Sequence, residues 1–399
     1  MTPCDAGAAV ERVARTAYGR LLAWLAARSR DVAAAEDALG DAFAAALRRW
    51  PADGVPDRPE AWLLTAARHR LADRARHGQV HAAAAATLLE LAEARAAPVP
   101  DFPDERLALL FVCAHPAIDA GAHTPLMLQT VLGLDAARIG AVFLVSPATM
   151  GQRLARAKAK IRTAGIRFAV PEPEALPQRL PAVLAAVYAA FSAGWDDGDG
   201  IAARRGGLVE EAIFLARLLV AQLPEAAEAR GLLSLMLLAA SRHPARRDAG
   251  GGFVPLSAQD PTLWIAPMID EGLGQLARAA TAQAPGRFQL EAAIQAVHSM
   301  RPTDWYEIAL LYEGLLAFAP TLGVRVGRAA AVGEALGAAE GLALLDGLDG
   351  AQAYQPYWAV RAHLLAFLGQ DAPEAARRAI ALSQDRAVRD WLAARYRIA

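Results

Sequence analysis

The chain has 399 residues, more than one hydrophobic core usually organises, so we expect several domains. Its 41 basic and 42 acidic side chains give no global sign of a nucleic-acid partner, whose footprint must be local. Two cysteines exclude a disulfide framework and suit a reducing compartment. Residues 1–12 lack a signal-peptide pattern, and the charge-free stretch over 180–195 is too short to span a membrane. We therefore expect a cytoplasmic protein without membrane contact.

Hydrophobic spacing predicts an all-α fold, because apolar residues recur at intervals of three and four and almost never alternate. One helical stripe runs over 10–25, and a second helix begins after Asp31, a good N-cap. Three prolines within 51–59 predict a loop, and a third helix follows over 60–77. Residues 80–103, rich in alanine and then proline, are predicted to be a linker.

The rest of the chain is also predicted to be helical. Helices are expected over 104–118, 135–144 and 147–164, and a proline-rich break covers 170–177. The long remainder contains a glycine-rich insert over 248–253. Near its end, segments 357–368 and 373–382 have the small and apolar positions typical of tetratricopeptide-like hairpins.

The predicted helices over 135–144 and 147–164 have the pattern of a helix-turn-helix. Ser146 can cap the second helix and Pro147 suits its first position. An apolar stripe is expected at Met150, Leu154, Ala157, Ile161 and Ala164. The predicted DNA-binding residues on the remaining surface are Thr149, Gln152, Arg153, Arg156 and Lys160. Thr149, Gln152 and Arg153 can reach base edges, while the later cations can bind phosphates. A solvated basic helix in an ordinary helical hairpin fits the same pattern.

Two earlier helices carry further candidate surfaces. The helix over 60–77 combines basic side chains with an aromatic residue near its start, which suits single-stranded DNA. The candidates there are Trp62, Arg68, Arg70 and Arg74. The helix after Asp31 carries an acidic patch that could dock a basic partner, formed by Glu36, Asp37 and Asp41 beside Phe43. Trp62 equally fits a core anchor, and the acidic patch equally fits a solvated face.

No enzyme signature is present, so no catalytic residue, metal or cofactor is predicted. Cys113 and His115 lie two positions apart, hence ~200° around a helix, and cannot face one metal ion. We expect Cys113 to be a buried structural residue. An enzyme using a pocket in the C-terminal half is a remaining alternative, supported only by loops rich in aspartate, glycine and tryptophan.

Several segments together resemble the extracytoplasmic-function sigma factors of the sigma-70 family, in the subgroup with a C-terminal tetratricopeptide-like domain. Residues 35–43 (AEDALGDAF) are similar to the region 2 segment that contacts the polymerase beta-prime clamp, and residues 56–74 to the part that melts the −10 element. Residues 104–116 and 148–158 are similar to region 4, the −35 reader. The likeness continues through 231–238, 259–264, 292–298 and 304–312.

This resemblance implies two small helical sigma domains, at 8–79 (region 2) and 104–168 (region 4, with the helix-turn-helix), followed by a regulatory helical domain at 179–399. The implied partners are promoter DNA and core RNA polymerase, through its beta-prime clamp and beta flap, with no separate anti-sigma factor. The implied clamp contacts are Glu36, Asp37, Asp41 and Phe43, and the implied −10 contacts are Trp62, Arg68, Arg70 and Arg74. The implied −35 contacts are Thr149, Gln152, Arg153, Arg156 and Lys160.

The chain also departs from that family pattern. Gly40 stands where the family usually has glutamine, within the clamp-binding helix, and Arg138 replaces the usual glutamate. Polar motif positions at 192–195, 261–263 and 321–330 are altered as well. The alternative interpretation is therefore a helical-repeat scaffold or interaction protein with a degenerate sigma module.

Overall fold

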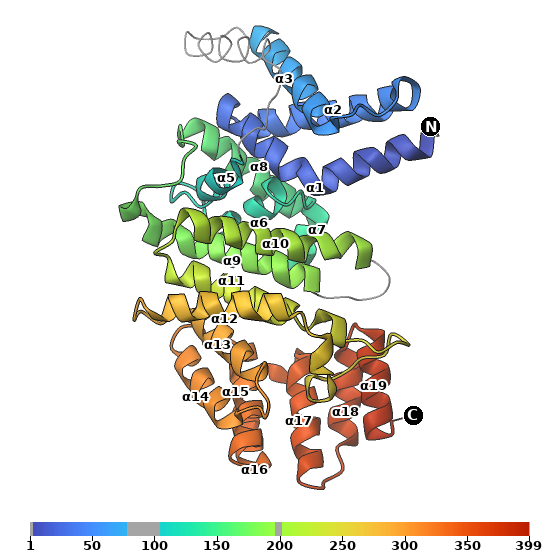
Figure 1. Cartoon of the computed structure of the whole chain (residues 1–399), viewed down its shortest axis with the longest axis vertical. Helices are drawn as coiled ribbons and strands as arrows, with labels where there is room; N and C mark the ends of the chain where they lie inside the picture. Colours follow the sequence, from blue (N-terminus) through green and yellow to red (C-terminus); the bar gives the residue numbers. More distant parts are fainter. Residues whose placement is uncertain (1–2, 78–103, 196–201, 399) are drawn as a thin grey trace. The chain divides into compact units, whose positions relative to one another are not determined.

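The structure is a computed structural model that describes residues 3–77, 104–195 and 202–398, with side chains over 6–74, 104–194 and 207–398 (Figure 1). The predicted linker over 80–103 lies outside these residues. The described elements are helices, joined by turns and one isolated bridge between Arg247 and Phe253, so the all-α prediction is confirmed. The chain folds as two compact units, Met1–Ala193 and Gly194–Ala399.

The first unit begins with three long helices that share one core. They are α1 (Pro3–Ser29), α2 (Val32–Asp53) and α3 (Pro59–His77). Asp31 caps α2 as predicted, because its side chain accepts the N–H of Ala34 at 3.1 Å. The fully buried side chains of this core include Leu21, Leu25, Leu39, Trp50 and Leu63. Burial of these large apolar groups is what holds the three helices together.

Shorter helices complete the first unit. They are α5 (Arg106–Cys113), α6 (Ala120–Thr130), α7 (Ala136–Val142), α8 (Pro147–Thr163) and α9 (Leu176–Trp195), which runs into the second unit. All eight residues of α5 are buried. The packing of α1 against both α5 and α6 joins the two halves of this unit into one body.

Three elements differ from the sequence predictions, each near a proline. Helix α2 continues through Pro51 to Asp53, so the predicted loop was wrong for its first three residues; a proline in the last turn removes only one helical hydrogen bond. The predicted helix over 104–118 was too long, since α5 ends at Cys113, before Pro116. Helix α6 was not predicted at all, because Pro125 interrupts its pattern.

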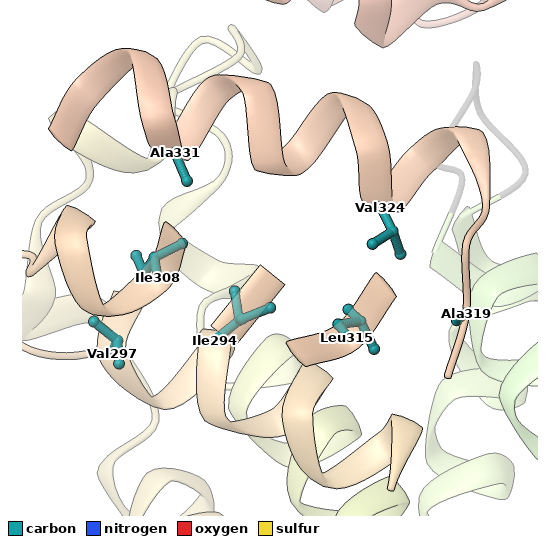
Figure 2. Close-up of a cluster of buried hydrophobic side chains, with 7 residues drawn as sticks. All are labelled: Ile294, Val297, Ile308, Leu315, Ala319, Val324 and Ala331. Atoms are coloured by element: carbon teal, nitrogen blue, oxygen red, sulfur yellow. The ribbon is translucent and has the colours of Figure 1, made fainter. Parts of the chain in front are cut away.

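The second unit is a succession of packed helices. They are α10 (Ala202–Gln222), α11 (Ala227–Ala240), α12 (Ala266–Ala280), α13 (Arg287–His298), α14 (Trp305–Leu316), α15 (Leu322–Ala335), α16 (Ala338–Asp346), α17 (Gln355–Phe367), α18 (Pro373–Leu382) and α19 (Arg386–Tyr396). Most of them pack against the next helix along the chain. Figure 2 shows one such core, where apolar side chains of α13, α14 and α15 meet. Its members are Ile294, Val297, Ile308, Leu315, Ala319, Val324 and Ala331.

Replacing two helical glycines of the first unit with alanine is expected to change the free energy of unfolding in opposite directions. A Cβ added at Gly40 meets nothing within 4 Å, so Gly40→Ala is expected to raise the free energy of unfolding by about 1 kcal/mol through helix propensity. A Cβ at Gly19 would lie 1.9 Å from the carbonyl oxygen of Val131. Because that backbone must move, Gly19→Ala is expected to lower the same free energy by about 1–3 kcal/mol.

Urea denaturation followed by circular dichroism measures both changes. Equal effects of the two substitutions would contradict the packing of α1 against the turn after α6.

Candidate nucleic-acid and polymerase interface

Helix α8 is built as the sequence predicted. The Ser146 hydroxyl accepts the N–H of Thr149 at 3.2 Å, and Pro147 occupies the first turn, where no N–H is needed. Met150, Leu154, Ala157 and Ile161 are buried, while Ala164, the last residue of the predicted stripe, is exposed at the C-cap. Burial of this stripe fixes the rotation of α8 and therefore decides which side chains face outward.

The turn before α8 is tight because of a glycine that the sequence reasoning missed. A Cβ on Gly140 would lie 2.7 Å from the carbonyl oxygen of Val145, so a side chain there would push the turn open. Helix α7 is capped by Asp135, which accepts the N–H of Arg138 at 2.8 Å and also pairs with its guanidinium. The only sequence signal for Gly140 is its place just before a turn.

The predicted DNA-reading side chains share one face of α8. Thr149, Gln152, Arg156 and Lys160 are exposed, and Arg153 is half-buried. The Arg153 guanidinium donates to the carbonyl of Gly121 at 3.5 Å, a long bond that holds it weakly. This face therefore presents hydroxyl, amide and cationic groups to solvent.

A second face of α8 contacts helix α2. Lys158 and Arg162 lie on roughly the opposite side of α8 from Thr149, at about 100° per residue. Lys158 forms an ion pair with Glu36 in which both side chains are largely buried. Arg162 donates to Asp31 at 3.3 Å. The basic residues of α8 are thus divided between an open face and an internal contact.

Most residues of the acidic patch of α2 contact other side chains of the first unit. Besides Lys158, Glu36 contacts the hydroxyl of Tyr18, whose pKa is raised by burial and by this carboxylate. Asp37 pairs with Arg74 at 2.9 Å. Phe43 is half-buried and stacks on Tyr18, with ring centroids 6.5 Å apart. Asp41 is exposed, next to the open position of Gly40.

Of the four candidate residues of α3, two are packed against other helices of the first unit and two lie on its surface. Trp62 is half-buried and meets the buried Trp50 edge to face at 5.5 Å, which fits the core-anchor interpretation of its ring. Arg68 is only 6% exposed and lies 5.9 Å from the centroid of Trp24. Burial and the charge of Arg28 lower the pKa of Arg68. Of the four, Arg70 and Arg74 remain on the surface, Arg74 in its pair with Asp37.

Comparisons with known proteins assign two segments of the chain. Residues 13–80 match the model of sigma-70 region 2, and residues 179–280 match a family of unknown function, DUF6596. An uncharacterized protein of Rhizobium meliloti is 38% identical over 381 residues, which cover 92% of this chain and 89% of that protein.

The chain belongs to the family of this Rhizobium protein, and its N-terminal part is a sigma-70 region 2 domain. No solved structure matches.

Sigma-70 region 2 includes α2, α3 and most of α1, so the acidic patch and the basic face of α3 both belong to it. In sigma factors this module interacts with core RNA polymerase and promoter DNA. Helices α7 and α8, predicted to form a helix-turn-helix, lie between the two matched segments. Within the described residues, no helix has both the length and the hydrophobicity of a membrane span.

Two features bear on the alternatives to a sigma factor. The thiol of Cys113 is fully buried beside the Thr130 hydroxyl, and its burial raises its pKa to about 12. In the second unit, a cavity of 540 Å³ lies between the glycine-rich insert and α19. Three carboxylates line it, those of Asp248, Asp385 and Asp390. Asp385 pairs with Arg247 at 2.6 Å; burial opposes its ionisation, but this bond and backbone N–H groups lower its pKa overall. A carboxylate with a lowered pKa is a weak general base and is not a proton donor near neutral pH.

Proposed function

We propose that this chain is an alternative sigma factor that binds core RNA polymerase and directs promoter-specific initiation. The observation that carries the proposal is the sigma-70 region 2 match over 13–80. The capped, outward-facing basic helix α8 supports a role for residues 104–168 as region 4, the −35 reader. We place the protein in the extracytoplasmic-function subgroup, acting in the cytoplasm, where its polymerase is, and without catalytic activity.

The roles of the side chains follow from this proposal. Region 2 would dock on the beta-prime clamp through Glu36, Asp37, Asp41 and Phe43, and region 4 on the beta flap. The −10 element would be engaged by Trp62, Arg68, Arg70 and Arg74. The −35 element would be read by Thr149, Gln152, Arg153, Arg156 and Lys160. Residues 179–399 would form a tetratricopeptide-like domain that modulates this activity.

Contacts within the first unit cover some of the residues that this proposal assigns to polymerase or DNA binding. Glu36 is held by Lys158, Asp37 by Arg74, and Arg68 is buried. Glu36 becomes available to polymerase only when α8 leaves α2, and Arg68 to DNA only when α3 shifts, whereas Asp37 and Arg74 are already exposed. We therefore infer that the present arrangement is a closed state, and that binding of polymerase selects an open one.

Affinity for core RNA polymerase tests the proposal through Asp41, an exposed acid of the patch. The labelled full chain should bind core enzyme in a fluorescence titration, and Asp41→Arg should weaken this binding about 10-fold or more, because it places a cation against a basic partner surface. Glu174→Arg is the matched control, an equal charge change at an exposed site outside region 2. A wild-type chain that does not bind core enzyme would favour the degenerate-module scaffold.

A further inference from the structure

The second unit contains a buried arginine without a counter-charge. Arg242 follows α11 and is 9% exposed, and its guanidinium donates to the backbone carbonyl of Gln295 at 3.4 Å and to the Oε1 of the same residue. Both acceptors are neutral. Among the described residues, no carboxylate lies within ion-pair distance of Arg242. A buried cation in this position is costly unless an anion accompanies it.

Other polar groups around Arg242 also lack partners. Trp264, 8% exposed, has no hydrogen-bond acceptor for its Nε1–H, and the Nδ1 of His298 is buried without a partner in the described structure. The segment that carries Trp264 is tied to α11, because the N–H of Ile265 donates to the carbonyl of Ser241 at 2.9 Å. Each unsatisfied buried group needs an explanation. Here the ring of Trp264 lies against Arg301, and His298 is acted on by the charges of Arg242 and Arg301.

A second arginine, Arg301, lies on the solvent side of Trp264. Arg301 is exposed, and its guanidinium lies 5.3 Å from the ring centroid of Trp264. It donates to the carbonyl of Leu256 at 3.0 Å, so the described structure gives it a neutral partner as well. The carboxylates of the adjoining segments, Asp260 and Asp304, instead accept the backbone N–H groups of Thr262 and Glu307, each at 2.9 Å.

The electrostatics agree with this geometry. Burial, followed by the charges of Arg246 and Arg301, lowers the pKa of Arg242 to about 10. Burial, followed by the charges of Arg242 and Arg301, lowers the pKa of His298 to about 4, so its imidazole is neutral at pH 7. With its proton on Nδ1, this neutral ring is a hydrogen-bond donor. No carboxylate is among the groups that act on either residue.

We propose that this cluster, formed by Arg242, Arg301, Trp264 and His298, binds the carboxylate or phosphate group of a small anionic ligand. The two guanidinium groups would pair with the oxyanion, and the indole N–H and the imidazole would supply further hydrogen bonds. An ordered water could satisfy an N–H group, but it carries no charge to offset the buried guanidinium of Arg242. The exposed Arg301 marks the side from which the ligand enters.

Binding is tested with the purified full chain and two probes, inorganic phosphate and acetate, at an ionic strength held constant with sodium chloride. A specific site gives a saturable rise in Tm with at least one probe, and a saturable change in tryptophan fluorescence, because Trp264 and Trp305 lie in or beside the cluster. The probe that binds more tightly tells whether phosphate or carboxylate is the recognised group. A rise that never saturates, or that chloride reproduces, would overturn the proposal.

Substitutions locate the site. Arg301→Ala removes an exposed side chain, so the fold is expected to persist while the Kd of the better probe rises at least 10-fold. Trp264→Phe keeps the ring but removes the N–H, and should raise the Kd a few-fold. Arg325→Ala, at an exposed arginine of α15, is the matched control and should leave the Kd unchanged. Equal weakening by Arg301→Ala and Arg325→Ala would mean a diffuse charge effect and would refute the site. The assay contains neither polymerase nor DNA, so its result is independent of the proposed sigma function.

Discussion

Replacing Lys158 with glutamate is expected to increase the affinity of the chain for core RNA polymerase about 10- to 100-fold. The substitution removes the ion pair that holds α8 on α2 and places a second carboxylate against Glu36 in a largely buried position. The closed state is thereby disfavoured, and the apparent Kd falls in proportion to the growing fraction of binding-competent molecules. A fluorescence titration with core enzyme in the absence of DNA measures this change.

Lys160→Glu is the matched control for this prediction. It makes the same charge change two residues further along α8, at an exposed position on the face that also carries Thr149. Labels on α2 and α8 should move apart in the Lys158→Glu variant and stay in place in the Lys160→Glu variant. If both variants bind core enzyme like the wild type, the contact between α2 and α8 does not regulate polymerase binding.

Replacing Arg153 with alanine is expected to relax promoter discrimination. A bidentate contact from arginine to a base contributes about 1–3 kcal/mol of discrimination, so binding to the preferred −35 sequence should weaken about 5- to 150-fold. Binding to mismatched sequences should change much less. The long bond from Arg153 to Gly121 leaves the side chain able to turn toward DNA. Anisotropy titrations, on duplexes selected from a random pool with the wild-type holoenzyme, give both affinities.

Lys160→Ala separates base reading from phosphate binding. Its exposed ammonium should contact the backbone, so its loss should weaken all sequences alike and reduce the log–log salt slope by about 0.9. If Arg153→Ala and Lys160→Ala each weakened every sequence to the same degree, the division of roles along α8 would be incorrect.

The local construction of the candidate site was predictable from the sequence. The N-cap at Ser146, the proline after it and the buried positions 150, 154, 157 and 161 follow from short-range rules of helix geometry, and the structure confirms them. Helix α6 was missed because its interior proline breaks the periodic pattern, although Leu126, Met127 and Leu128 are buried. Tertiary burial there outweighs the local signal.

The partners of the charged residues could not be predicted. Lys158 and Glu36 are 122 positions apart, and nothing in either helix indicates that their faces meet. The burial of Arg68 beside Trp24 likewise depends on how α3 packs against α1. Sequence pattern shows that a face is charged, while the packing of helices decides whether that charge meets solvent, another side chain or a partner.

Transcription by core RNA polymerase tests the central claim most directly. Core enzyme with the full chain should initiate at discrete sites on genomic template DNA, and core enzyme alone should not. The Lys158→Glu variant should initiate at the same sites at lower protein concentration. If the chain bound core enzyme and DNA but directed no initiation at any site, the sigma function proposed from region 2 would be contradicted.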